Sequence, residues 1–157
     1  MKKSFLTILV LLSLCFEVQA QQEGLRLGTH IGLPMSDASD VSSFHLGVDA
    51  SYLFDVTENL AVGAATGYST FFSKDDFDNY SYVPVAASLR GAFSWSIFYT
   101  ADLGYAVALE DGAKGGLYYQ GKLGWAFGKV DVFGFYKGIF EDDASLDAIG
   151  AGVAYKF

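Results

Sequence analysis

Residues 149–157 read IGAGVAYKF, an alternation of two kinds of side chain. In steps of two, Ile149, Val153 and Phe157 fall on an apolar face, and the other face carries glycine, alanine and Lys156. A period of two is typical of a β-strand. A closing aromatic residue suits the rim of a membrane better than open water. The stretch therefore predicts a membrane-spanning strand.

Eight segments of the chain alternate in this way. They cover residues 24–33, 44–54, 59–72, 80–93, 95–109, 116–127, 129–140 and 147–157. Longer polar connections follow the odd-numbered segments, and short turns follow the even-numbered ones. This pattern predicts an all-β fold, an eight-stranded antiparallel up-and-down transmembrane β-barrel, with both termini on the periplasmic side beside the short turns.

A soluble barrel with an apolar interior would alternate equally well. Two features favour the membrane. The polar face is built largely of glycine, alanine and serine, which suit the narrow interior of an eight-stranded barrel better than an open surface. Aromatic residues also recur near the strand ends of the apolar face, as interfacial girdles require. These residues are Phe44, Phe54, Trp95, Trp125, Phe127 and Phe157.

The N-terminal residues have the pattern of a secretory signal. Lys2 and Lys3 precede an apolar run over residues 5–16, and a small-residue cleavage site ends at Ala20. The run is too short to span a bilayer. We therefore expect residues 1–20 to be a cleaved signal peptide and residues 21–157 to form one outer-membrane β-barrel domain.

The charge balance limits the partners of the chain. The formal net charge is −8, so nucleic acid is not an expected partner. A barrel of this type would contact outer-membrane lipid and lipopolysaccharide, and we expect it to be a monomer. The sequence contains no phosphate-binding loop, dinucleotide fingerprint, cysteine metal motif or nucleophile elbow, so no cofactor and no catalytic centre are expected.

Charged and histidine side chains recur on the face predicted to line the lumen. Charges in a narrow lumen must pair or meet water, which predicts a network of ion pairs and hydrogen bonds that plugs the barrel. The alternative is a narrow pore for ions or small solutes, although eight strands leave almost no channel. The predicted network consists of Arg26, His30, His45, Asp49, Arg90, Asp102, Lys122, Asp131, Lys137 and Lys156.

His30 and His45 are the only histidines. A hairpin that pairs residue 33 with residue 44 places His30 diagonal to both His45 and Asp49, within reach of a shared partner. A metal site, or a histidine that acts as a base for Ser51, is then conceivable. Two histidines are too few ligands for zinc, so structural hydrogen bonding is the favoured interpretation.

Acidic residues gather in the four longer connections. Clustered carboxylates can bind Ca²⁺ or Mg²⁺, but no calcium-loop spacing is present, and acidic loops are usually only solvated, which is the favoured interpretation. These residues are Asp37, Asp40, Asp75, Asp76, Asp78, Glu110, Asp111, Glu141, Asp142, Asp143 and Asp147.

Two places fit the barrel pattern less well. Pro84 removes a backbone donor in the middle of a strand, and we expect a β-bulge beside it. In segment 129–140, Phe133, Phe135 and Ile139 fall on the luminal face, which suggests a bulge or a change of register.

Three motifs carry a family resemblance. Residues 24–28 read GLRLG, residues 80–85 read YSYVPV ahead of Arg90, and the chain closes on GVAYKF. In these motifs the mature chain resembles the small eight-stranded outer-membrane β-barrel proteins of the OmpA/OmpX-like type, and the outer membrane protein β-barrel domain group common in Bacteroidetes. The resemblance implies that Pro84 is accommodated. It also implies that Tyr155 and Phe157 form the signal read by the outer-membrane assembly machinery.

The resemblance implies architecture far more than activity. We expect an integral outer-membrane protein with a structural or surface-interaction role, a plugged lumen and short acidic extracellular loops. A lipid-modifying outer-membrane enzyme is a second alternative, but no motif of those families is present.

Overall fold

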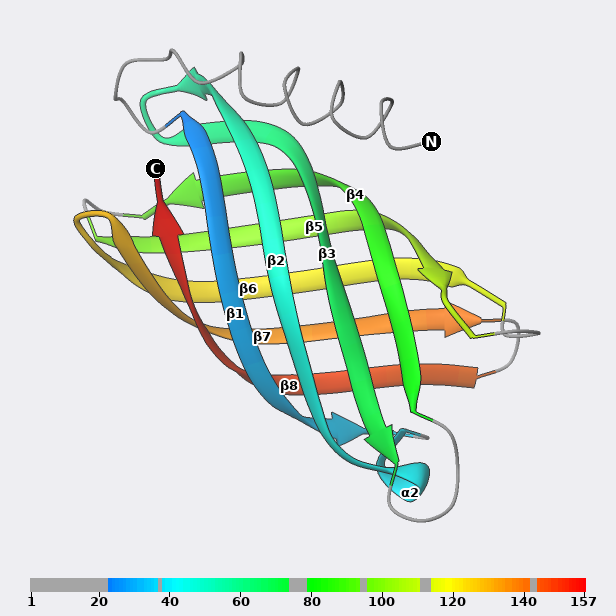
Figure 1. Cartoon of the computed structure of the whole chain (residues 1–157). Coiled ribbons are helices and arrows are strands. Elements are labelled where there is room, and N and C mark those ends of the chain that lie inside the picture. Colours follow the sequence, from blue (N-terminus) through cyan, green and yellow to red (C-terminus); the bar gives the residue numbers. More distant parts are fainter. Residues whose placement is uncertain (1–22, 37, 74–78, 94–95, 111–113, 142–143) are drawn as a thin grey trace, which may run out of the picture.

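The computed structural model describes residues 23–36, 38–73, 79–93, 96–110, 114–141 and 144–157. Their strands form a closed antiparallel barrel in sequence order (Figure 1). The strands are β1 (Gly24–Met35), β2 (Ser42–Thr57), β3 (Leu60–Ser73), β4 (Tyr80–Ala92), β5 (Ile97–Ala108), β6 (Gly116–Phe127), β7 (Val130–Glu141) and β8 (Ala144–Lys156), with a short helix α2 (Ala38–Val41) between β1 and β2. The predicted fold class is confirmed, and most strand ends lie within three residues of those predicted.

Pairing between β1 and β8 closes the barrel. The register runs from Arg26 opposite Lys156 to Met35 opposite Asp147. Since the first and last strands pair with each other, the sheet has no open edge whose backbone groups would lack partners. Across the described ranges, no helix is long and apolar enough to cross a bilayer.

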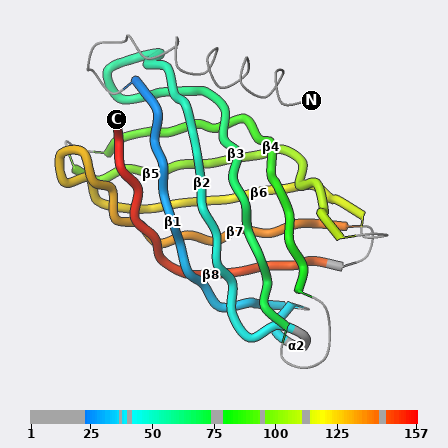
Figure 2. Tube along the Cα trace, viewed as in Figure 1, coloured from blue at the N-terminus to red at the C-terminus, as the bar shows by residue number. Residues whose placement is uncertain are grey.

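The two ends of the barrel differ. The ends of β2, β4 and β6 and the starts of β3, β5 and β7 lie at one end of the barrel, together with the C-terminus, and we call this the turn end (Figure 2). Helix α2 lies at the opposite end, the loop end. In the β6–β7 turn Gly128 has φ 65°, a conformation that costs other residues more than glycine.

The outer surface of the barrel is apolar. Exposed side chains include Leu103 in β5, Leu123 in β6 and Val153 in β8. The predicted aromatic positions also face outward. Phe54, Trp125, Phe127 and Phe157 are exposed near the turn end, and near the loop end Phe44 stacks on Phe72 with ring centroids 4.4 Å apart. Trp95 lies outside the described residues.

Large rings share the interior with the expected small residues. In β7, Phe133, Phe135 and Ile139 are buried, and the register with β6 and β8 is regular throughout, so neither a bulge nor a register change occurs there. Glycines make room for these rings. A Cβ on Gly152 would lie 2.7 Å from the Phe133 ring, and one on Gly32 would lie 2.9 Å from that of Phe135.

The predicted bulge beside Pro84 is absent. The register of β4 with β3 is the same on both sides of Pro84, and its register with β5 runs through Pro84 opposite Ala106. The Thr66 hydroxyl donates a hydrogen bond to the Pro84 carbonyl at 2.8 Å. This bond joins β3 to β4 at the proline, so the missing N–H is tolerated without an extra residue.

Asp147 was predicted as the first residue of the segment 147–157 and was also counted with the acids of the outer loops. It lies inside β8, because that strand begins at Ala144. The alternation of β8 points Asp147 outward, yet its side chain is buried beneath Tyr119 of β6, whose hydroxyl donates to it. The Ser145 hydroxyl donates to its other oxygen at 2.9 Å. The acids at 37, 75, 76, 78, 111, 142 and 143 and the predicted signal peptide at 1–20 lie outside the described residues.

The apolar outer surface predicts that a charged side chain destabilises the barrel more in the middle of the membrane than near its rim. Leu103 lies in mid-strand on the outer face and is 60% exposed. Leu103→Arg should lower the free energy of unfolding in lipid by about 2–4 kcal/mol, whereas Val107→Arg, nearer the end of the same strand, should cost about 1 kcal/mol or less. Urea titration in lipid vesicles measures both. Equal costs at the two depths would contradict the assignment of the outer face to lipid.

Candidate functional site in the barrel interior

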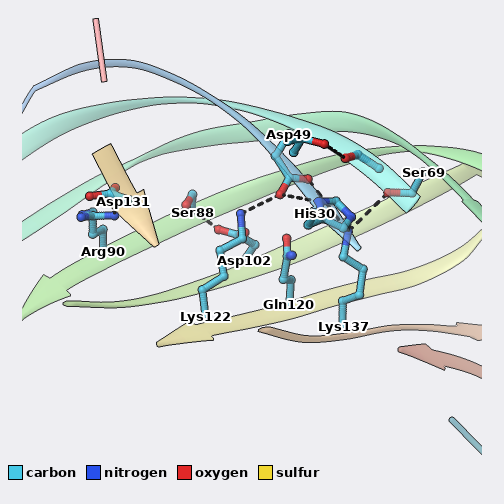
Figure 3. Close-up of polar contacts among 12 residues, drawn as sticks. His30, Asp49, Ser69, Ser88, Arg90, Asp102, Gln120, Lys122, Asp131 and Lys137 are labelled. Carbon is cyan, nitrogen blue, oxygen red and sulfur yellow. Dashed lines mark hydrogen bonds and ion pairs between the residues drawn. The ribbon is translucent and has the colours of Figure 1, made fainter. Parts of the chain in front are cut away.

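All ten residues of the predicted network alternate onto the inner face of the barrel. The structure divides them into smaller groups along the barrel axis (Figure 3). An arginine–aspartate group lies toward the turn end, a group around Asp49 lies in the middle, and His45 lies toward the loop end. Lys156 is half-buried opposite Arg26.

The group toward the turn end is built around one carboxylate. Asp131 of β7 lies 2.9 Å from Nη1 of Arg90 in β4, and 3.6 Å from Nε of Arg26 in β1. The Arg90 guanidinium lies over the ring of Phe98, 3.6 Å from its centroid. Aspartate and ring together hold Arg90 in place, because a guanidinium can stack on a ring face and bind a carboxylate at the same time.

The central group joins four strands through Asp49. The Lys122 ammonium donates to Asp49 Oδ2 at 2.9 Å, and Nδ1 of His30 lies 3.2 Å from the same oxygen. The alignment of the His30 contact is poorer than that of a good hydrogen bond. On the other side of the ring, Nζ of Lys137 lies 2.8 Å from His30 Nε2, 3.3 Å from Ser69 Oγ and 3.9 Å from Asp49 Oδ1.

This geometry fixes the form of His30. A charged lysine can only donate hydrogen bonds, so Nε2 of His30 must accept. The ring is then neutral, with its proton on Nδ1, which faces Asp49. His30 therefore links an ammonium group and a carboxylate, and Lys137, which is fully buried, has several polar partners.

The predicted hairpin register around the histidines is confirmed. His30 is opposite Gly47, with His45 and Asp49 on the diagonals. The two imidazoles stack with centroids 5.2 Å apart, and the Tyr82 hydroxyl lies 3.4 Å from Nε2 of His45. Within the described ranges, no cluster of three or more His, Cys, Asp or Glu side chains has the arrangement of a metal site, and no hydrogen bond joins Ser51 to either histidine.

A small chamber separates the central and turn-end groups. Its volume is about 30 Å³, and its walls include Ser51, Thr100, Asp102 and Lys122. Asp102 accepts a hydrogen bond of 2.5 Å from the hydroxyl of Ser88. A space of this size holds about one or two water molecules.

Aromatic rings fill the loop half of the interior, which the sequence interpretation missed. Phe71, Tyr82, Tyr118 and Phe135 form one buried cluster with Ala38 of helix α2. The sequence did contain a signal for this cluster, because strand alternation places Tyr82, Tyr118 and two phenylalanines of β7 on the luminal face. The cluster was not predicted because the lumen was expected to hold mainly small side chains, with only a few large ones.

Comparison with known proteins identifies the fold of this chain but no family. No protein-family model matches the sequence, and neither does any curated protein. Solved structures do match. The fold is that of the small transmembrane β-barrels. The crystal structure of Ail, the attachment invasion locus protein of Yersinia pestis, aligns with a TM-score of 0.61 and 14% identity over 87% of this chain and 100% of that one.

Two further structures agree. The N-terminal β-barrel domain of Pseudomonas aeruginosa OprF aligns with a TM-score of 0.57 and 14% identity, over 87% of this chain and 100% of that chain. The de novo designed barrel TMB2.3 aligns with a TM-score of 0.58 and 13% identity, over 89% and 98%. At these identities the likeness concerns the fold alone.

The central group predicts a large cost for removing Lys137. Lys137→Met leaves His30 Nε2 and Ser69 without their ammonium donor and weakens the balance of charge around Asp49. It should lower the free energy of unfolding by about 3 kcal/mol. Lys129→Met, at an exposed turn, should change it by less than about 0.5 kcal/mol. Urea unfolding in lipid vesicles measures both, and equal effects would show that the central group contributes nothing to stability.

Proposed function

We propose that this protein is an integral outer-membrane β-barrel with a structural or surface-interaction role, and that it acts neither as a pore nor as an enzyme. The observation that carries the proposal is the apolar outer surface around a sheet with no open edge. In water such a surface would drive aggregation, whereas in lipid it is the stable arrangement.

The outer membrane is the proposed location for two reasons. Residues 1–20 have the pattern of a cleaved export signal, and Ail, one of the proteins with this fold, is an outer membrane protein. Both termini would then lie in the periplasm, and the loop end would face the medium. The motifs at residues 24–28, 80–85 and 152–157 resemble those of the OmpA/OmpX-like barrels of Gram-negative bacteria, which supports this location.

A closed lumen is part of the proposal. Among the described residues, buried rings and helix α2 occupy the loop half, and the central ion pairs occupy the middle. The chamber between them and the turn-end group measures about 30 Å³. A hydrated ion would have to displace several of these side chains. A pore is therefore a weaker reading than a plugged barrel.

The remaining contacts are those expected of a surface protein. A monomer would meet lipid and lipopolysaccharide around its belt, and partners in the medium at its loops. One Ail structure contains a heparin analogue, sucrose octasulfate. The loops of this chain are rich in Asp and Glu, so a cationic partner fits them better than a polyanion.

A conductance measurement tests the closed lumen. Protein refolded into planar lipid bilayers should give no unitary current steps, because no continuous water path crosses the rings and the central group. A band that migrates differently before and after boiling should first show that the barrel is folded. A large-pore porin reconstituted in the same way checks the assay. Discrete current steps from the folded protein would favour the pore.

The terminal aromatic residue predicts an assembly defect. Phe157→Ala keeps the backbone hydrogen bond from Phe157 to Leu25 but removes the side chain proposed as the assembly signal. Its folded, heat-modifiable level in the outer membrane should fall several-fold while signal cleavage continues. Phe127→Ala removes an equally exposed ring at the same end and should have no such effect. Equal levels of the two variants would remove the proposed role of Phe157.

A further inference from the structure

A cavity of about 550 Å³ opens at the turn end of the barrel, beyond the arginine–aspartate group. Its polar walls include Arg26, Arg90, Lys156 and Asp131, and Phe98 and Ile97 contribute apolar surface. The volume falls in the range of small-molecule sites. The chamber of about 30 Å³ lies deeper in the lumen and shares Arg26, Arg90 and Asp131 with it, so a bound solute would stop at these three side chains.

The charges around this cavity favour an anion. Of the described lining residues, Arg26, Arg90 and Lys156 are cationic, and Asp131 and Glu58 are anionic. Asp131 pairs with both guanidinium groups at once, and Asp55, which is not a lining residue, also lies near Arg26 and Lys156. Glu58 is exposed in the β2–β3 turn.

The strand register adds a second observation. Arg26 and Lys156 are directly opposite each other on β1 and β8, and both alternate onto the inner face. Like charges at directly opposed positions of a sheet are destabilising. Lys156 is also the final residue of the final strand and lines the cavity close to its open end.

We propose that this turn-end cavity is a binding site for a small phosphate-bearing anion. The planar guanidinium of Arg90, held by Asp131 and Phe98, presents its remaining donors in the fork that matches phosphate oxygens. Lys156 supplies a second, flexible charge from the opposite wall. The phosphate can belong to a free solute or to a lipid headgroup that reaches the mouth of the barrel.

The test uses the full mature protein refolded in a neutral detergent, with pyrophosphate as the probe. Isothermal titration calorimetry at low ionic strength should give saturable binding of one pyrophosphate per barrel. Lys156→Gln should weaken binding about tenfold, the value of one charge-assisted contact. Lys129→Gln removes an equal charge from the same end, but outside the cavity, beside Tyr155, and should leave the affinity within about twofold.

A third variant should raise the affinity for pyrophosphate instead of lowering it. Asp131→Asn releases both guanidinium groups from their carboxylate, so it should tighten pyrophosphate binding severalfold, provided that boiled and unboiled samples still migrate differently. The proposed site would be overturned if the heat of pyrophosphate binding to the wild-type protein did not saturate. An equal loss of affinity in Lys156→Gln and Lys129→Gln would also overturn it. The second result would mean that only the net charge of the turn end attracts the probe.

Lipid composition then separates the two sources of phosphate. In nanodiscs of phosphatidylcholine with phosphatidylglycerol, an anionic headgroup that occupies the cavity should weaken pyrophosphate binding in the wild-type protein more than in Lys156→Gln. With a free solute as the natural ligand, the ratio between wild-type and variant affinities should match the ratio in detergent. Both outcomes support the site and identify the source of its phosphate. The site is overturned if Lys156→Gln and Lys129→Gln have the same affinity for pyrophosphate in detergent and in nanodiscs.

Discussion

Hydrogen bonding between the first and last strands is the constraint on which the rest of this structure depends. In hydrocarbon no water can satisfy a backbone N–H or C=O, so an open sheet edge costs several kcal/mol for each group. Pairing of Arg26 through Met35 with Lys156 through Asp147 removes that edge. Closure at eight strands in turn fixes a narrow interior, and every inward side chain must fit within it.

The narrow interior imposes two packing solutions. Near the turn end and in the middle, charges pair across the barrel, as Asp131 does with Arg90 and Asp49 with Lys122. Near the loop end, large rings pack together, and glycines on neighbouring strands make room for them. The same pairing of ring and glycine occurs outside, where the Tyr119 ring lies over Gly138. Glycine is therefore as much a part of the packing as the aromatic residues.

The strands, their order and the histidine register could be predicted because they depend on local alternation and on the length of one hairpin. His30 and His45 belong to adjacent strands, so pairing residue 33 with residue 44 was enough to place them. Contacts across the barrel could not be predicted in the same way. Asp49 and Lys122 lie 73 residues apart, and their meeting depends on the stagger of all eight strands.

The predictions at Pro84 and Asp147 that the structure contradicts also have specific causes. The bulge at Pro84 was expected from the missing backbone donor alone. The hydroxyl of Thr66, on the adjacent strand β3, instead donates a hydrogen bond to the Pro84 carbonyl. Asp147 was counted with the acids of the outer loops although it also begins the segment 147–157, and Tyr119 and Ser145 satisfy its oxygens on the outer wall. Thr66 and Tyr119 both belong to strands other than that of the residue they bind, so alternation within one strand could not reveal these contacts.

The unequal filling of the two halves has an electrical consequence. Water can enter the turn half through the cavity of about 550 Å³, whereas rings and α2 occupy the loop half. In a barrel closed in this way, a voltage across the membrane would fall mainly over the ring-filled half, since water and mobile ions screen the other. The ammonium of Lys137, buried beside the Phe135 ring, would then lie at the edge of the region over which that voltage falls.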